Sequence, residues 1–210
     1  MAVEYLRISL TDRCNLNCVY CTPLEKHGYL PHDELLRHEE IARAAAAFVR
    51  DGVTKIRLTG GEPLLRKNVV ELVRMLKAIP GLKELALTTN GIKLAGMAAD
   101  LRAAGLDRVN ISLDSLKEET FRKITGFPGL DKVLAGIDAS LKAGFSQVKL
   151  NVVIMRGIND SEVEDFARLS IDRPLNVRFI ELFPTNTRAT KLFNAHFPTA
   201  EAKKRIEAAL

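Results

Sequence analysis

All three cysteines of this 210-residue chain lie within eight residues, at Cys14, Cys18 and Cys21. An odd set of clustered cysteines cannot be fully used in disulfides, so the pattern indicates metal binding or catalysis. A helix would spread the three sulfurs over about 10 Å of its axis, and in a strand Cys21 would face away from the other two. We therefore expect a curled loop, for which Asn15 and Asn17 are typical residues, that turns three thiolates toward one compact object.

Three soft thiolates are suited to an iron–sulfur cluster. Clusters that only transfer electrons usually have four protein ligands, so a set of three would leave one iron open to another molecule, as catalytic metal sites do. Two alternatives stay open: a zinc site completed by His27 or His32, and three unligated core cysteines. Zinc sites usually contain cysteines paired two residues apart, and free cysteines are usually scattered, so both alternatives fit this spacing less well.

Length and composition predict one large domain with a real core, since 47% of the residues are apolar. No apolar run long enough to span a membrane exists, and no signal-peptide pattern precedes the first predicted strand. Together with clustered reduced cysteines, this predicts a cytoplasmic protein without membrane contact. The net charge of +5 is spread along the chain, which indicates a solvated surface or an anionic ligand. The absence of Trp and the low aromatic content argue against nucleic-acid binding.

A unit of strand, polar loop and helix recurs along the chain. We expect strands at 5–10, 55–59, 84–88, 108–113, 147–153 and 177–182. We expect helices at 38–50, 67–78, 95–104, 130–143 and 161–170. Several of these helices are followed by a glycine suited to a left-handed cap, at Gly52, Gly81, Gly105 and Gly144. The alternation predicts a parallel α/β sheet, and six units without a reversal of strand order predict a partial (β/α)6 barrel of TIM type with outer helices.

The last residues, 199–210, are predicted to form one more helix with Thr199 as its N-cap. Asp160 or Ser161 is the expected N-cap of the helix before it. We assign 1–198 to one core domain, and 199–210 to a C-terminal helix that starts a further region.

One face of the predicted sheet is unusually polar for parallel strands that are buried on both sides. Every second residue of four strands gives Arg7, Ser9, Thr11, Lys55, Arg57, Thr59, Asn110, Ser112, Asp114, Lys149 and Asn151. The alternate positions are apolar and would pack on the outer helices. We therefore expect a wet, ligand-binding barrel interior in which Arg7, Arg57 and Lys149 converge on a polyanion. The alternative is a structural network in which these cations pair with acidic neighbours.

Unusual residues also follow the strands at their carboxyl ends, where α/β barrels carry their chemistry. The cysteine loop follows the first strand. The second strand is followed by Gly60, Gly61, Glu62 and Pro63. The glycines let backbone approach a ligand, the glutamate can accept from an ammonium group, and the proline stiffens the turn. Asn90 and Ser115 follow the third and fourth strands, and each could instead serve as a local turn residue.

The cysteine spacing, with Tyr20 before the last cysteine, resembles the signature of the radical S-adenosylmethionine (SAM) enzymes. Residues 60–63 strongly resemble the motif with which those enzymes hold the amino group of methionine. A wider set of segments resembles the GTP 3′,8-cyclases of molybdenum cofactor biosynthesis: 6–9, 11–15, 55–66, 88–91, 110–115, 149–153 and 178–181. This resemblance runs from about residue 5 to residue 184.

The resemblance implies that Cys14, Cys18 and Cys21 hold a [4Fe-4S] cluster whose open iron binds SAM through its amino and carboxylate groups. One electron would cleave SAM to methionine and a 5′-deoxyadenosyl radical, which in the family takes hydrogen from C3′ of GTP before the carbon radical attacks C8. The residues placed against SAM are Tyr20, Gly60, Gly61, Glu62, Pro63, Ser112 and Phe183. The residues placed against GTP are Arg7, Arg57, Thr88 and Lys149. An electron donor protein is the implied partner.

Two features depart from the family pattern. Phe183 stands where the family usually has a SAM-contacting methionine, so an apolar contact is retained. The family also binds a second cluster through three further cysteines, and that cluster binds guanine, whereas this sequence contains only three cysteines in all. We therefore expect either part of such an enzyme or a shortened relative that acts on a peptide or another nucleotide. A non-catalytic iron–sulfur carrier is the third alternative, and a homodimer could cover the open side of the barrel.

Overall fold

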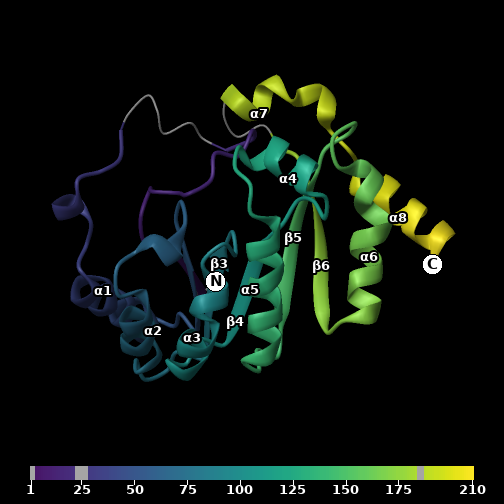
Figure 1. Ribbon diagram of the computed structural model, residues 1–210. Helices are drawn as coiled ribbons and strands as arrows, with labels where there is room; N and C mark the ends of the chain where they lie inside the picture. Colours follow the sequence, from purple (N-terminus) through teal and green to yellow (C-terminus); the bar gives the residue numbers. More distant parts are fainter. Residues whose placement is uncertain (1–2, 22–27, 184–186) are drawn as a thin grey trace.

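The computed structural model describes residues 3–21, 28–183 and 187–210, and its six strands form a single parallel sheet (Figure 1). The strands pair in chain order: β1 (Tyr5–Ser9), β2 (Lys55–Thr59), β3 (Glu84–Thr89), β4 (Arg108–Ser112), β5 (Val148–Ile154) and β6 (Leu175–Glu181). Within the described residues β1 and β6 are the two edges, since they do not pair with each other. This confirms the predicted partial barrel.

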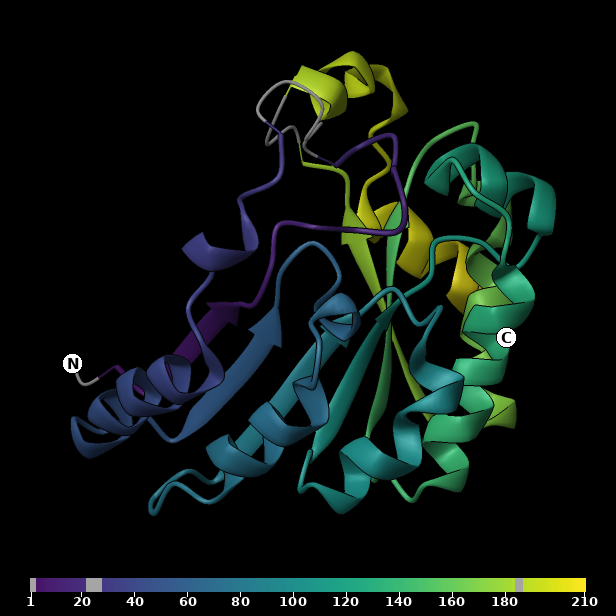
Figure 2. The same ribbon diagram turned by 60° about the vertical axis from the view of Figure 1, so that its left-hand side comes forward.

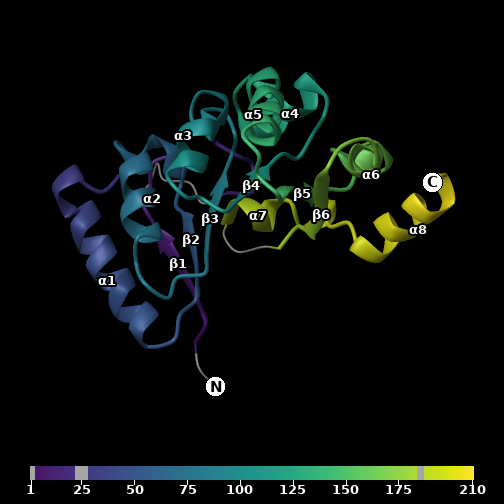
Figure 3. The ribbon, with the colours of Figure 1, turned by 90° about the horizontal axis from the view of Figure 1, so that it is seen from below.

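Most of the helices line one face of the curved sheet, as the view along the strands shows (Figure 3), whereas the helix labelled α7 lies beyond its carboxyl edge (Figure 1). The helices are α1 (His38–Arg50), α2 (Val69–Lys77), α3 (Ala98–Ala103), α4 (Glu118–Thr125), α5 (Leu130–Lys142), α6 (Val163–Asp172), α7 (Thr187–Lys191) and α8 (Thr199–Ala209). Short 3-10 turns are η2 (His32–Glu34), η3 (Pro63–Leu65), η4 (Leu94–Gly96), η5 (Asp160–Glu162) and η6 (Phe193–Ala195). Among the described segments, no helix is long and apolar enough to cross a membrane.

The main core lies between the sheet and these helices, because the apolar residues of each strand alternate onto that side. Ile56, Leu58 and Ile111 are buried there against helix residues such as Leu72 and Leu76. Burying each such side chain stabilises the fold by roughly 1.5–3 kcal/mol. The predicted glycine caps are confirmed by positive φ at Gly52, Gly81, Gly105 and Gly144. We call the face of the sheet opposite the core the open face.

Three predictions about helices need correction. The helix predicted at 95–104 is split into η4 and α3, and α6 starts at Val163 after η5, so Glu162 is its N-cap and neither Asp160 nor Ser161 is. The short helices α4 and α7 were not predicted. Thr199 is the first residue of α8 rather than its N-cap.

The cap of α8 comes from the sheet. Glu181 accepts hydrogen bonds from the Thr199 backbone N–H (2.9 Å) and hydroxyl (2.7 Å), and its other oxygen lies 3.0 Å from Nε2 of His196. The Thr199 hydrogen bonds, together with His196, lower the pKa of Glu181 to about 2. A carboxylate supplied by another element could not be read from the sequence near the helix start.

Candidate functional site

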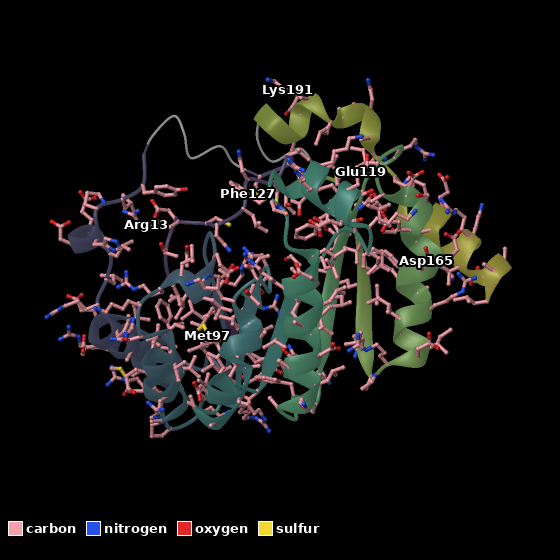
Figure 4. All side chains as sticks on the ribbon, viewed as in Figure 1. Arg13, Met97, Glu119, Phe127, Asp165 and Lys191 are labelled. Atoms are coloured by element: carbon pink, nitrogen blue, oxygen red, sulfur yellow. The ribbon has the colours of Figure 1, made fainter. Side chains whose placement is uncertain are left out.

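The cysteine loop crosses the carboxyl edge of the sheet, where all strand arrowheads point (Figure 2). Cys14 and Cys18 are half-buried and Cys21 is exposed. The three cysteines line one cavity of about 640 Å³ together with residues of β1, the loop after β2 and two aromatic side chains: Ser9, Thr11, Gly60, Gly61, Tyr29 and Phe127. Phe127 stands beside the loop from the α4–α5 connection (Figure 4). The structure thus brings the three predicted ligands together.

The three cysteines line one cavity, and this arrangement suits a cluster. The described residues include no group of three or more His, Cys, Asp or Glu placed to hold one metal ion. An iron–sulfur cluster binds each thiolate through a different iron, so its ligands need not converge on one point. Burial raises the pKa of Cys14. The pKa of Cys18 is raised mainly by its hydrogen bond with Cys21 and, to a smaller extent, by burial. Both thiols therefore need a bound cation to favour their thiolate forms.

The zinc alternative gains no support from the histidines. His32 lies on η2 and lines a different cavity, beyond Arg13, on the α1 side of the loop. His27 lies outside the described residues. The cavity at the cysteines and the one at His32 share Thr11 in their linings, with Asp12 lining the first and Arg13 the second. Asp12 accepts from the backbone N–H of Leu30 (2.6 Å), and the Arg13 guanidinium lies 5.0 Å from the Tyr29 ring centroid.

The second half of the cysteine loop is fastened to α4 and to the end of β4. The backbone N–H groups of Asn17 and Val19 donate to the carbonyls of Thr125 and Ile124 at 2.8 and 2.9 Å. The Tyr20 hydroxyl donates to Asp114 at 2.6 Å.

Asp114 is a buried carboxylate whose second oxygen accepts from the backbone N–H of Val153 at 2.8 Å. Burial raises the pKa of Asp114 to about 6, although both hydrogen bonds oppose the shift. Tyr20 was predicted to contact SAM. Its hydroxyl is used to hold the loop.

The two glycines after β2 are required by backbone packing. The N–H of Gly61 donates to the Thr11 carbonyl and the N–H of Glu62 to the Arg13 carbonyl, both at 2.7 Å. A Cβ on Gly60 would lie 2.5 Å from the Thr11 oxygen, and one on Gly61 would overlap the Arg13 carbonyl. The sequence suggested close approach to a ligand. The structure shows that the loop also approaches the segment preceding Cys14, while both glycines line the cavity.

Glu62 joins the loops after β2 and β3. It is 1% exposed, and one oxygen accepts from the Thr89 hydroxyl (2.7 Å) and the Leu64 N–H (3.0 Å). The other oxygen accepts from the Asn90 backbone N–H at 2.7 Å. Burial raises the pKa of Glu62. Pro63 is also buried, so these two predicted SAM contacts lie behind the cavity wall.

Asn90 holds the first half of the cysteine loop. Its Nδ2 donates to Asn15 Oδ1 at 2.8 Å and lies 3.9 Å from the Cys14 sulfur. Its Oδ1 accepts from the Ile92 N–H, so the predicted turn role is also present. Hydrogen bonds to ligand sulfurs tune cluster potentials. The sequence marked Asn90 only as a polar residue after a strand, because its partner lies 75 residues away.

The sheet register sorts the side chains of the open face into three levels. The lower level holds Arg7, Arg57, Ala86 and Arg108. The middle level holds Thr88, Asn110, Lys149 and Asn176. The upper level, nearest the cysteine loop, holds Ser112, Asn151 and Arg178. The predicted GTP contacts thus occupy the lower and middle levels, and Ser112 lies between them and the loop.

The cations of the open face are mostly not neutralised. Arg108 pairs with Glu84 at 2.7 Å, as the structural-network alternative expects. Among the described residues, no carboxylate forms an ion pair with Arg7, Arg57 or Lys149. Partial burial, then Arg108 and Arg178, lowers the pKa of Lys149. This face therefore favours a polyanionic ligand.

Phe183 is 75% exposed at the end of the described part of the chain that follows β6. The structure places it at the carboxyl edge of the sheet, where the cysteine loop also lies, but it is not among the residues that line the cysteine cavity.

These features, a partial barrel with three cysteines on the loop after its first strand, agree with the family match. The chain matches the model of the radical SAM superfamily over residues 8–170, and it belongs to that superfamily. Radical SAM enzymes use a [4Fe-4S] cluster and SAM, which confirms both predicted cofactors. The residues that hold them remain predictions.

Curated relatives narrow the resemblance. The chain is 54% identical over 204 residues to the GTP 3′,8-cyclase of Moorella thermoacetica, covering 97% of this chain and 63% of the relative. It is 53% identical over 206 residues to that of Geobacter sulfurreducens, covering 98% and 63%. The predicted resemblance is confirmed, and the chain spans 63% of the length of these two relatives.

Solved structures show the same fold at low sequence identity. SuiB of Streptococcus suis, bound to its precursor peptide SuiA, aligns with a TM-score of 0.78 at 16% identity, over 100% of this chain and 46% of that one. The Escherichia coli radical SAM enzyme coproporphyrinogen III oxidase aligns with a TM-score of 0.63 at 16% identity, over 98% and 50%.

Proposed function

We propose that this chain carries out radical SAM chemistry of the GTP 3′,8-cyclase type, a lyase reaction that converts GTP to 3′,8-cyclo-7,8-dihydro-GTP. The observation that carries the proposal is the meeting of two features at one edge of the sheet. Ser9 of the open face and Thr11, which follows β1, line the same cavity as the three cysteines, and Arg7 lies two residues before Ser9 on the same face of the sheet. Relatives at 53–54% identity bear this enzyme name.

In this proposal Cys14, Cys18 and Cys21 hold the cluster. When bound, the cluster supplies the electron that cleaves SAM. SAM is surrounded by Gly60, Gly61, Tyr20, Ser112 and Phe183. The loop that contains the two glycines is held in place by Glu62 and Pro63.

The substrate phosphates would be bound by Arg7, Arg57, Thr88 and Lys149. Arginine forks and a lysine suit phosphate oxygens. These contacts would place the sugar near the cysteine loop, where radical chemistry starts, so that positioning limits side reactions.

A second candidate keeps the SAM chemistry and changes the substrate to a peptide or another nucleotide. It is favoured by the open face itself, whose cations suit the phosphate groups of any nucleotide. A non-catalytic iron–sulfur carrier is the third candidate. An electron donor protein and a cytoplasmic location belong to the leading proposal, and a homodimer stays a prediction.

The test is an anaerobic assay of the iron- and sulfide-reconstituted chain with SAM and a strong reductant. We expect 5′-deoxyadenosine to form faster with GTP than without it. Formation that GTP does not change would favour another substrate. If no 5′-deoxyadenosine formed although the cluster absorbance was intact, the result would favour a non-catalytic iron–sulfur carrier. Arg57→Ala should weaken GTP binding and leave SAM binding unchanged.

A further inference from the structure

Three buried N–H donors on the open face have no acceptor among the described residues: Arg57 Nε, Arg108 Nε and Asn110 Nδ2. The arginines belong to the lower level and Asn110 to the middle level. Buried polar groups are nearly always hydrogen-bonded, and an unpaired one lowers stability. The unpaired buried atoms of these two levels are all donors, so they point to water or to a ligand rich in acceptor oxygens that replaces it.

Asn110 is the most enclosed of the three, with 2% of its surface exposed. The register places Thr88 of β3 on one side of it and Lys149 of β5 on the other. Adjacent strands lie about 4.8 Å apart, so a hydroxyl, an amide and an ammonium group stand in a row across three strands. Each of these three groups can donate a hydrogen bond to an oxygen.

The upper level, which also holds the exposed Arg178, differs from the other two in its unpaired buried atom. Its unpaired buried atom is Asn151 Oδ1, an acceptor, which neighbours Ser112 in the register. A ligand that satisfies both levels presents acceptor oxygens to the lower and middle levels and a hydroxyl or N–H group toward the cysteine loop. A nucleotide has this polarity, with phosphates at one end and sugar hydroxyls beside them.

We propose that Asn110 is a direct substrate-binding residue, whose Nδ2 donates a hydrogen bond to a phosphate oxygen between Thr88 and Lys149. This assignment rests on the nucleotide substrate proposed above. It adds a neutral donor to the cationic contacts and orients the phosphates away from the cysteine loop. A phosphate oxygen only accepts hydrogen bonds, so it can pair with Asn110 Nδ2, the unpaired buried donor of the middle level.

The experiment uses the full reconstituted chain and measures binding of inorganic triphosphate, GTP and guanosine by calorimetry. Asn110→Leu should weaken triphosphate and GTP about tenfold or more, the typical effect of losing a hydrogen bond to a charged group. Asn110→Asp should weaken both further, because its carboxylate repels phosphate. Asn176→Leu is the matched control, since Asn176 is an exposed amide on the same level, and it should bind like the wild type.

Thermal unfolding separates binding from a structural role. If the Asn110 amide is unpaired in the ligand-free protein, Asn110→Leu should have a Tm equal to or above that of the wild type. If the amide makes hydrogen bonds that stabilise the fold, the variant should have a lower Tm. A lowered Tm together with unchanged triphosphate affinity of Asn110→Asp would overturn the assignment. The assignment would also be overturned if Asn110→Leu weakened guanosine binding as much as triphosphate binding, or if Asn176→Leu weakened triphosphate binding as much as Asn110→Leu does.

The wild-type chain separates this inference from the proposed function. Suppose that the wild type binds triphosphate as well as GTP and that Asn110→Leu loses this binding. That result would support the phosphate contact and overturn the choice of GTP. Wild-type binding of GTP that Asn110→Leu retains would overturn the contact alone. Failure of the wild type to bind any of these anions would overturn both.

Discussion

Tyr20→Phe tests how the cysteine loop is held. The change removes one hydroxyl, which donates to the buried Asp114 carboxylate at 2.6 Å, and leaves the ring in place. The other Asp114 oxygen keeps its hydrogen bond from the Val153 N–H. We expect the variant to be less stable at pH 8 by about 1.5–3 kcal/mol, the value of a hydrogen bond to a charged group.

The loss should depend on pH, because Asp114 titrates in the folded state. Its folded pKa of about 6 lies above the unfolded value of 3.8. The stability contributed by this group is therefore complete below pH 3.8 and is lost as the pH rises through about 6. A shift of about 2 units corresponds to about 3 kcal/mol between those limits. Without the Tyr20 hydroxyl the pKa of Asp114 should rise further, so the variant should lose more stability on the alkaline side than the wild type.

The assay is urea unfolding of cluster-free protein at pH 5 and pH 8, with Tyr5→Phe as the matched control. Tyr5 is 41% exposed on β1, and its ring contact with Arg57 does not need the hydroxyl. We expect a loss for Tyr20→Phe that is clearly larger at pH 8 than at pH 5, and almost none for Tyr5→Phe. Equal losses at both pH values, or a loss below about 0.5 kcal/mol at pH 8, would refute the anchoring role.

Three further predictions concern the same architecture. Gly61→Ala should reduce the iron and sulfide bound after reconstitution, because its Cβ would overlap the Arg13 carbonyl, whereas Gly96→Ala, with open space around the new Cβ, should bind normal amounts. Asn90→Ala should shift the cluster midpoint potential to a more negative value in a redox titration, since a donor near the Cys14 sulfur is lost; an unchanged potential would argue against that contact. Glu181 has a lowered pKa, so its contribution is present above pH 4.5 and is lost as the pH falls toward 2. Glu181→Gln should therefore make α8 exchange its amide hydrogens faster at neutral pH than the wild type does, and the two proteins should converge near pH 2.

Much of the fold could be predicted from the sequence because its patterns are local. Alternating apolar residues placed all six strands to within two residues, and α1 was placed at its observed bounds. The same alternation separated core from open face, so Arg57 and Lys149 were assigned to one face without knowledge of their neighbours. Helix α4 was not predicted because it is short and mostly polar. It holds the cysteine loop through the backbone carbonyls of Thr125 and Ile124, and every residue type has such a carbonyl, so the sequence could not indicate this role.

The contacts that hold the site were less predictable because they join distant segments. Tyr20 and Asp114 are 94 residues apart, and neither residue type implies the other. Glu62 was expected to face a ligand, yet its oxygens are used by Thr89 and the Asn90 backbone. The sequence shows which residues follow each strand, whereas the packing decides which of them face the cavity and which hold the loops together.

The long span of these contacts has a consequence for how the protein matures in the cell. The cysteines are synthesised before the residues that hold the second half of their loop, since Asp114 and Thr125 follow Cys21 by more than 90 residues and Val153, which supports Asp114, follows later still. Until α4 and β5 have packed, the second half of the cysteine loop lacks these contacts, whereas Asn90 can already hold the first half. Iron and sulfide delivered to the nascent chain at that stage would meet a loop whose second half, with Cys18 and Cys21, is not yet fastened. We therefore expect cluster insertion to follow synthesis of β5, so that the thiols need protection from oxidation until β5 has been made.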